Sequence, residues 1–219
     1  MNSPILQLLV LAGIAIFLFL RLKNVLGTRE GFEKPPETES PKTIIKRPEF
    51  EVIDGSPDRD IIDNVPEGST SAIALAEMKR ADNSFEVTDF VSGARSAYEM
   101  ILMAFEQGTL EDIRLYLSSE VYDAFDEVVQ DRQKKGLTID ANFIGVREIA
   151  INEVTFNTNT KVAEITVRYV GELTNVVRDA EGTIIEGNET SPKRQKDIWT
   201  FARKMASGDP NWQLVATGE

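Results

Sequence analysis

The side chains that could do chemistry in this chain are limited, because its 219 residues include neither cysteine nor histidine. Without cysteine there is no disulfide, no thiolate nucleophile and no sulfur metal site, which fits a reducing compartment. Without histidine the commonest general base, proton shuttle and transition-metal ligand is missing. Catalysis would therefore have to use Asp, Glu, Tyr or Lys alone.

An aspartate base opposite a tyrosine hydroxyl is one arrangement that these residue types allow, because burial in a cavity shifts the pKa of such groups. Tyr98 and Tyr116 are the candidate hydroxyl donors. The acids near the predicted strands occupy alternating positions that we expect to face water: Asp140, Glu164, Glu172 and Asp197. We therefore predict no catalytic residue and no cofactor, and an isomerase-like enzyme remains only as an alternative.

The charged residues argue against a nucleic-acid site by their balance and against a metal site by their spacing. The sequence has 36 acidic and 24 basic residues, a formal net charge of -12, so nucleic acid is not an expected partner. The acidic clusters at residues 37–39, 58–60 and 186–189 lack the spacing of a calcium loop, so we predict no metal site. Two basic groups could either hold the domain against anionic lipid or simply solubilise a loop: Lys134 with Lys135, and Lys193 with Arg194 and Lys196.

A membrane anchor is predicted at residues 1–26. The run PILQLLVLAGIAIFLFL carries no charge, and its 17 residues would reach roughly 26 Å as a helix, at the short limit for a bilayer. The basic residues Arg21, Lys23 and Arg29 follow the run, whereas a secretory signal peptide has its positive charge before it. The positive-inside rule then places the N-terminus outside and the rest of the chain in the cytoplasm.

An acidic, proline-rich tether is predicted at residues 27–68, where apolar residues are too scattered to form a face. A flexible segment of this length has a root-mean-square span on the order of 35 Å. Two short apolar groups, Ile44 with Ile45 and Ile61 with Ile62, are either partner-binding motifs or incidental residues of a linker.

The folded domain is predicted at residues 69–219, and its first half is helical. A short helix is expected at residues 71–81. A longer one begins after Asp89 as its cap and ends at Gly108, with apolar residues at three- and four-residue spacing. Thr109 and Asp112 resemble a capping box that opens a short helix over residues 110–117, and Ser119 begins a further helix that ends at Gly136.

The second half alternates apolar and polar residues, which is typical of strands with one buried face. Strands are predicted at residues 143–157, 161–175, 196–205 and 212–217, with a tight hairpin joining the first two and a polar excursion over residues 179–195 before the third. Helices followed by an antiparallel meander predict an α+β fold, with the helices on one face of a curved sheet of about four strands.

Two stretches carry a family resemblance: FVSGARSAYEMILMAFEQGTLEDIRLYLSSEVYDAFDEVV, and WTFARKM followed by DPNWQLVAT. They resemble the C-terminal domain of the Tim-forty-four-like family, the mitochondrial inner-membrane import-translocase adaptors, over residues 84–218. With the predicted anchor and the LGTREGF that follows it, the chain looks closest to the alphaproteobacterial TimA type. The resemblance implies a cone-shaped, nuclear-transport-factor-two-like fold, a bacterial inner-membrane location, a protein partner of translocase or chaperone type, and contact with anionic lipid.

The chain also departs from the mitochondrial members, which have a basic, presequence-led N-terminal region for contacts with their Hsp70 motor and channel. No matching motif occurs between Gly27 and Gly68, so motor recruitment does not carry over by residues.

A cone fold would place a cavity between its long helix and the concave sheet, and seven large side chains are expected to line or cap it: Tyr98, Ile101, Phe105, Tyr116, Phe125, Trp199 and Trp212. They form either an apolar pocket for a lipid chain or hydrophobic peptide, or plain core. The resulting hypothesis is a membrane-anchored, non-catalytic adaptor. The alternative is a module that binds lipid or a small hydrophobic ligand.

Overall fold

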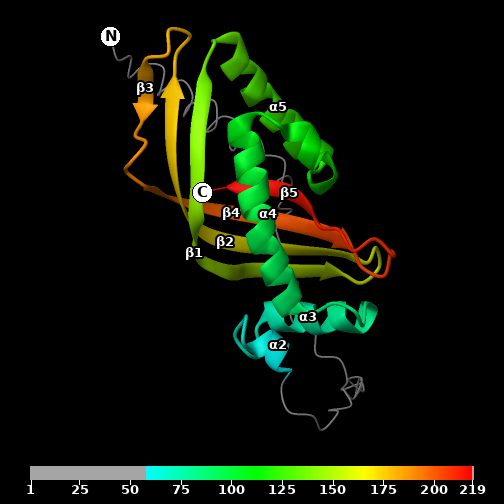
Figure 1. Cartoon of the computed structure of the whole chain (residues 1–219). Helices are drawn as coiled ribbons and strands as arrows, with labels where there is room; N and C mark the ends of the chain where they lie inside the picture. Colours follow the sequence, from blue (N-terminus) through cyan, green and yellow to red (C-terminus); the bar gives the residue numbers. More distant parts are fainter. Residues whose placement is uncertain (1–57, 219) are drawn as a thin grey trace, which may run out of the picture. The chain divides into compact units, whose positions relative to one another are not determined.

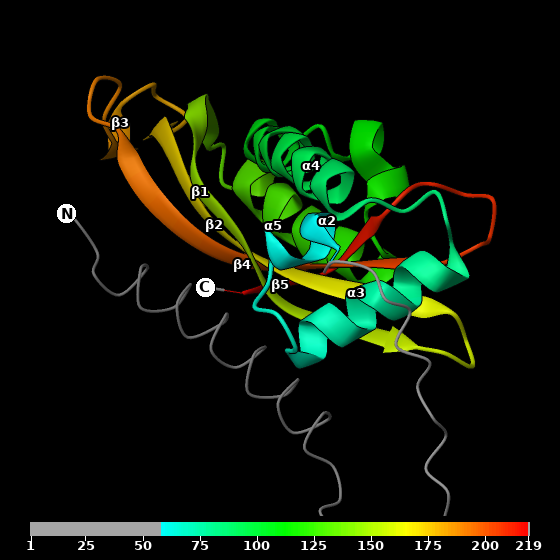
Figure 2. The same ribbon diagram turned by 90° about the horizontal axis from the view of Figure 1, so that it is seen from below.

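The sheet is antiparallel and strongly curved (Figures 1 and 2). The computed structural model describes residues 58–218. Its strands are β1 (Thr138–Asn157), β2 (Val162–Arg178), β3 (Ile184–Gly187), β4 (Lys193–Lys204) and β5 (Gln213–Gly218). Their order is β1-β2-β4-β5, and β3 pairs with the end of β2. The prediction of an α+β fold with an antiparallel sheet is confirmed. The polar excursion contains one strand, β3, that was not predicted.

Strand β2 changes partner along its length, and this divides the sheet into two parts. Residues 162–173 of β2 pair with β4, whereas residues 176–178 pair with β3. Strand β1 follows β2 throughout, with three shifts of register, near Phe143, Val146 and Ile151. Each shift is a bulge-like irregularity that increases the local twist and bends the strand. The far part of the sheet therefore turns away from the part that carries the core.

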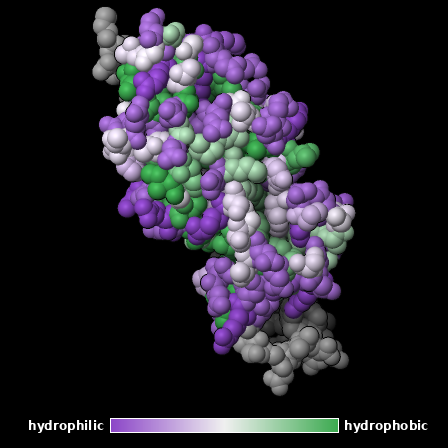
Figure 3. All heavy atoms as spheres, viewed as in Figure 1, coloured by the Kyte–Doolittle hydropathy of each residue, from purple (hydrophilic) through white to green (hydrophobic). Residues whose placement is uncertain are grey.

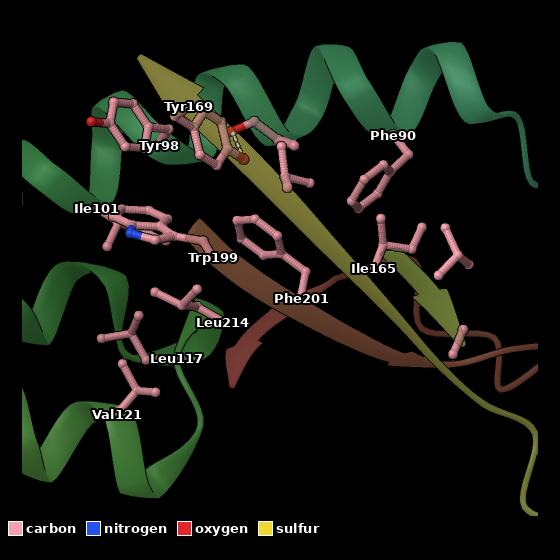
Figure 4. Packing of buried hydrophobic residues seen from close by; sticks show 14 of the residues in the cluster. Phe90, Tyr98, Ile101, Leu117, Val121, Ile165, Tyr169, Trp199, Phe201 and Leu214 are labelled. Carbon is pink, nitrogen blue, oxygen red and sulfur yellow. Dashed lines mark hydrogen bonds between the residues drawn. The ribbon is translucent and has the colours of Figure 1, made fainter. Parts of the chain in front are cut away.

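The helices are α2 (Arg59–Ile62), α3 (Thr70–Ala81), α4 (Val87–Gln107), the 3-10 helix η1 (Leu110–Tyr116) and α5 (Ser119–Lys134). Helix α4 lies across one face of the sheet, with α5 on the same side (Figure 2). The buried side chains of α4 recur at helical spacing and include Phe90, Ala94, Tyr98 and Ile101. They meet the inward-facing residues of β2 and β4, so the core lies between helix and sheet (Figure 4).

The folded part begins earlier than predicted. Ile61 and Val65 are buried in the core, and Lys79 of α3 bonds the carboxylates of Asp58 and Asp60 at 2.9 Å each. Residues 58–68 therefore belong to the domain, because an apolar pair and an ion-pair network hold them there. The tether predicted for residues 27–57 lies outside the described residues.

No helix within residues 58–218 is both long enough and apolar enough to span a membrane. The predicted anchor at residues 1–26, with Arg21, Lys23 and Arg29, lies outside the described residues and stays a prediction.

Two predicted helix starts are wrong in detail. Asp89 does not cap α4, whose N-cap residue is Glu86, and Thr109 makes no capping hydrogen bond to η1. Helix α4 instead receives its capping carboxylate from Asp60, which accepts hydrogen bonds from the backbone N–H groups of Val87 and Thr88 at 2.7 and 2.8 Å. A cap supplied from a distant segment leaves no local sequence pattern.

Candidate functional site: an apolar cavity beside α4

A cavity of about 310 Å³ lies between the first half of α4 and the turn that joins β4 to β5. Helix α4 contributes small residues to its wall, namely Gly93, Ala94 and Ala97, which leave the space open. A Cβ atom added to Gly93 would meet no atom within 4 Å. The volume is at the lower end of the range for small-molecule sites.

Aromatic rings form much of the rest of the wall. Trp212 packs edge-on against Phe90, with ring centroids 4.8 Å apart, and lies 6.0 Å from the ring of Phe85. Phe201 of β4 meets Phe90 from the sheet side, with ring centroids 6.2 Å apart, and Figure 4 shows both rings in the layer between α4 and the sheet. Ile101 and Tyr116 complete the apolar lining. Such a surface suits an alkyl chain or an apolar side chain.

Among the described residues, Arg203 is the one cationic side chain in this lining. Its Nη2 atom donates to the Asp82 carboxylate at 2.9 Å, and its guanidinium carbon lies 5.1 Å from the centre of the Trp212 ring. Only 9% of the side chain is exposed, and Nε has no hydrogen-bond partner among the described residues. Arg203 therefore fixes Trp212 and the β4–β5 turn through charge and stacking.

Glu86 and Asp89 also border the cavity, and a network of ion pairs lies beside them. Lys79 bonds the carboxylates of Asp58, Asp60 and Glu86 at 2.8–2.9 Å. Partial burial alone would raise the pKa of Asp60, but hydrogen bonds from Thr88, Lys79 and the backbone of Val87 hold it well below its usual range. This network fixes the first turn of α4, where the cavity begins.

The seven predicted residues fall into three groups. Ile101, Tyr116 and Trp212 line the cavity. Phe105 and Phe125 form a ring pair with centroids 4.7 Å apart, at the other end of α4. Ligand binding by any of the seven stays a prediction.

Tyr98 and Trp199 form the third group, and both are buried in the core. Their ring centroids are 4.8 Å apart, and Tyr98 stacks on Tyr169 at 4.4 Å. The hydroxyl of Tyr169 in turn donates to the Ala94 carbonyl at 3.1 Å, the hydrogen bond drawn in Figure 4. Neither Tyr98 nor Trp199 contributes to the lining of the cavity.

Tyr98 also contacts an acid that we expected to face water. Its hydroxyl donates to Oδ2 of Asp197 at 2.5 Å, and Gln195 donates to Oδ1 at 3.1 Å. Burial, reinforced by this bond, raises the pKa of Tyr98. The prediction for Asp197 is wrong because this residue has the same alternation as Trp199 and therefore points to the core.

Glu172 is the second acid that was placed incorrectly, since only 6% of it is exposed. It lies on the outer face of the sheet, as alternation requires, but two arginines cover it. Asp140 and Glu164 are exposed, as predicted.

A second cavity, of about 210 Å³, lies between the end of α4, the end of α5 and the start of β1. Glu106 borders it, with Arg132 3.9 Å away, and Phe105 is also in its lining. Burial raises the pKa of Glu106, although the positive charge of Arg132 acts in the opposite direction. Within residues 58–218 there is no group of acidic side chains arranged to hold a metal ion.

Sequence reasoning missed Phe201 and Arg203 as cavity residues, although a signal for both exists. They continue the inward alternation that begins at Asp197 and Trp199, so β4 lines first the core and then the cavity. Sequence reasoning also overlooked the small residues of α4, because it considered only large side chains.

Residues 71–219 match the Tim44-like domain. The chain belongs to this family. Two relatives of known name are each 24% identical to it. One is a probable mitochondrial import inner membrane translocase subunit, tin-44, of Caenorhabditis elegans, aligned over 64% of this chain and 34% of its own length. The other is the mitochondrial import inner membrane translocase subunit TIM44-1 of Arabidopsis thaliana, aligned over 54% of this chain and 25% of its own length.

This Tim44-like chain thus spans about a third or less of the length of these relatives. A solved structure, the intermembrane space region of the chloroplast protein ARC6, covers 57% of this chain and 94% of its own at 11% identity, with a TM-score of 0.36. That likeness is too weak to define the fold or the function. The Tim44-like assignment therefore depends on the sequence match over residues 71–219.

Proposed function

We propose that this protein is a membrane-anchored, non-catalytic adaptor of the protein-translocase type, whose Tim44-like domain binds a partner protein. The observation that carries the proposal is the family match over residues 71–219, together with relatives that are named as import translocase subunits. The exposed large apolar side chains of the domain are spread over several elements and include Leu115 on η1, Ile144 on β1 and Ile185 on β3. On the face seen in Figure 3, hydrophobic side chains lie in small groups among hydrophilic ones.

Site-specific photo-crosslinking of the full chain in its own cells tests this role. A crosslinking residue at Asn211, which is exposed and borders the cavity, should capture the same membrane or translocase protein in repeated experiments. A matched probe at Ile185, which is 53% exposed on β3 and not part of the lining, should not capture it. Capture of no reproducible partner from either position would contradict the adaptor role.

The membrane part of the proposal is a single pass at residues 1–26 in a bacterial inner membrane, with the N-terminus outside and the domain in the cytoplasm. The closer likeness to the alphaproteobacterial TimA type also stays part of this proposal. Because the chain has no cysteine, single cysteines report topology without background. Asn2→Cys should react with an impermeant maleimide added outside the inner membrane, and Ser191→Cys should react only after lysis. The opposite pattern would reverse the topology.

A second candidate function, binding of a lipid chain or small hydrophobic ligand, is favoured by the cavity itself. Its lining is mainly aromatic and aliphatic, and the charged residues Glu86, Asp89 and Arg203 also border it. Ala97→Leu would fill part of the space. This variant, as the full chain in zwitterionic nanodiscs, should therefore bind an apolar fluorescent probe more weakly than the unmodified chain does. Ala150→Leu, at an exposed position on β1, is the matched control. Equal binding by both variants would exclude the cavity as the site.

A further inference from the structure

The charges of the domain are unevenly distributed. Helices α4, η1 and α5 together contain ten acidic and four basic residues, whereas the five strands contain seven acidic and eight basic residues. The acidic excess of these elements thus lies on the helices, whereas the strands are close to neutral. A group of basic side chains on the sheet can therefore determine the sign of the local charge, and local charge directs association.

Four basic side chains project from the outer face of the sheet, the face opposite α4: Arg147, Arg168, Arg194 and Lys196. We call this group the sheet patch. Register places them close together, because Glu172 pairs with Arg194, Val170 with Lys196 and Arg168 with Ile198. No described helix covers this face at the bend of the sheet (Figure 2).

The centre of the sheet patch is a buried carboxylate between two exposed guanidinium groups. Glu172 accepts a hydrogen bond from Nε of Arg147 at 2.7 Å and another from Nε of Arg194 at 2.8 Å, and its ion pair with Arg147 brings Nη2 to 2.5 Å. The side chain of Glu172 is 9% exposed, whereas those of Arg147 and Arg194 are 59% and 73% exposed. These bonds lower the pKa of Glu172, so it stays charged and holds both arginines in place.

Most donors of the two arginines remain available. A guanidinium has five N–H donors, and among the described residues Arg147 and Arg194 use only those directed at Glu172. Arg168 pairs with Glu148 at 3.2 Å, and Lys196 makes no ion pair within residues 58–218. The sheet patch therefore presents fixed, planar donors with a local excess of positive charge. That is the geometry that receives carboxylates in pairs of hydrogen bonds.

We infer that the sheet patch binds an acidic segment of a partner protein, through carboxylates that reach Arg147 and Arg194, with Glu172 as the positioning residue. A short acidic segment fits better than an anionic membrane. A planar membrane would meet the whole outer face of the sheet, and the exposed carboxylates of Glu153 and Glu164 on that face would oppose it. A segment meets only the local charge, because screening limits the reach of the rest to about 8 Å at physiological salt. This inference is independent of what occupies the cavity.

Binding of a fluorescein-labelled oligoglutamate to the full chain in zwitterionic nanodiscs tests the inference by fluorescence anisotropy. Arg147→Gln and Arg194→Gln should each weaken binding about tenfold, the effect of losing a charged hydrogen bond. Arg114→Gln is the matched control, because Arg114 is also 59% exposed and paired with a glutamate, but lies on η1. It should bind as the unmodified chain does. Thermal melting of each variant confirms that it is folded.

The role of Glu172 is tested separately with Glu172→Gln. Loss of the positioning carboxylate should weaken binding even though the sheet patch becomes more positive, whereas a diffuse charge effect would strengthen it. Stronger binding would overturn the inference. So would unchanged binding by Arg147→Gln and Arg194→Gln, or an equal loss in Arg114→Gln. Binding to anionic vesicles that requires both arginines, without binding to oligoglutamate, would identify a membrane contact and also overturn it.

Discussion

Replacing Asp60 with asparagine tests whether a carboxylate from α2 stabilises the start of α4. The Asp60 carboxylate accepts four hydrogen bonds, from the Val87 and Thr88 N–H groups, the Thr88 hydroxyl and Lys79, at 2.7–2.9 Å. Hydrogen bonds to a charged group contribute about 1.5–3 kcal/mol each, against about 0.5–1.5 kcal/mol for neutral pairs. Asparagine keeps one acceptor but loses the charge and the second oxygen.

The expected loss is therefore about 2–4 kcal/mol, because the four bonds share one side chain and are not additive. For a domain of this size, each kcal/mol lowers Tm by about 2–4 °C, so the expected shift is roughly 5–15 °C. Asp63→Asn is the control, since Asp63 is an exposed carboxylate just beyond the same short helix. It should change stability by no more than about 0.5 kcal/mol.

The same substitution has a pH dependence with a defined sign. The pKa of Asp60 is lowered in the folded state, so the unfolded state takes up the proton first, near pH 4. The stabilisation is fully present above about pH 4 and is lost as the pH falls below it. The difference in Tm between the unmodified chain and Asp60→Asn should therefore shrink in acid. A constant difference from neutral pH to about pH 3, or a neutral-pH loss no larger than that of Asp63→Asn, would refute the capping role.

Four further substitutions test the packing of α4 and of the strand β2 beneath it. Gly171→Ala should cost about 1–3 kcal/mol, because its Cβ would lie 2.7 Å from the Tyr98 hydroxyl, whereas Gly93→Ala should gain up to about 1 kcal/mol in the same melting assay. Tyr98→Phe should lower stability by about 1–3 kcal/mol, since it removes the buried hydrogen bond to Asp197. Glu106→Gln should raise Tm at neutral pH, because burial raises the pKa of Glu106, and the gain should disappear below about pH 4, the opposite sign to Asp60→Asn. A destabilised Glu106→Gln at neutral pH would show instead that its attraction to the neighbouring cation outweighs its burial.

Local patterns in the sequence gave correct predictions wherever the cause of a structure is local. Helix α3 occupies Thr70–Ala81, against a prediction of residues 71–81. The hairpin between β1 and β2 lies at the run of Asn and Thr residues, as predicted. There the Lys161 N–H donates a hydrogen bond to the Asn157 carbonyl at 2.8 Å. In β2 the alternating residues Ala163, Ile165, Val167 and Tyr169 are all fully buried. Periodicity determines these features by itself.

Features built from distant residues could not be predicted in this way. The cap of α4 comes from Asp60, and the burial of Glu172 comes from Arg147 and Arg194, each on a different strand. Asp197 is a different case. Its position two residues before Trp199 indicates an inward side chain, whereas its charge favours contact with water. The hydrogen bond from the Tyr98 hydroxyl allows the inward position, because it gives the buried carboxylate a polar partner.

The cavity illustrates why large residues alone are a poor guide to a binding site. Tyr98 and Trp199 are large side chains at inward-facing positions, yet large rings that pack against each other fill the space between them, as their 4.8 Å separation shows. Space remains one turn earlier on α4, where Gly93, Ala94 and Ala97 face the sheet and the β4–β5 turn. One helix thus has a packed half and an open half, set by side-chain volume. Since the open half is also the end that α2 holds through its carboxylate, the short segment before α3 helps to shape the cavity as well as to stabilise the fold.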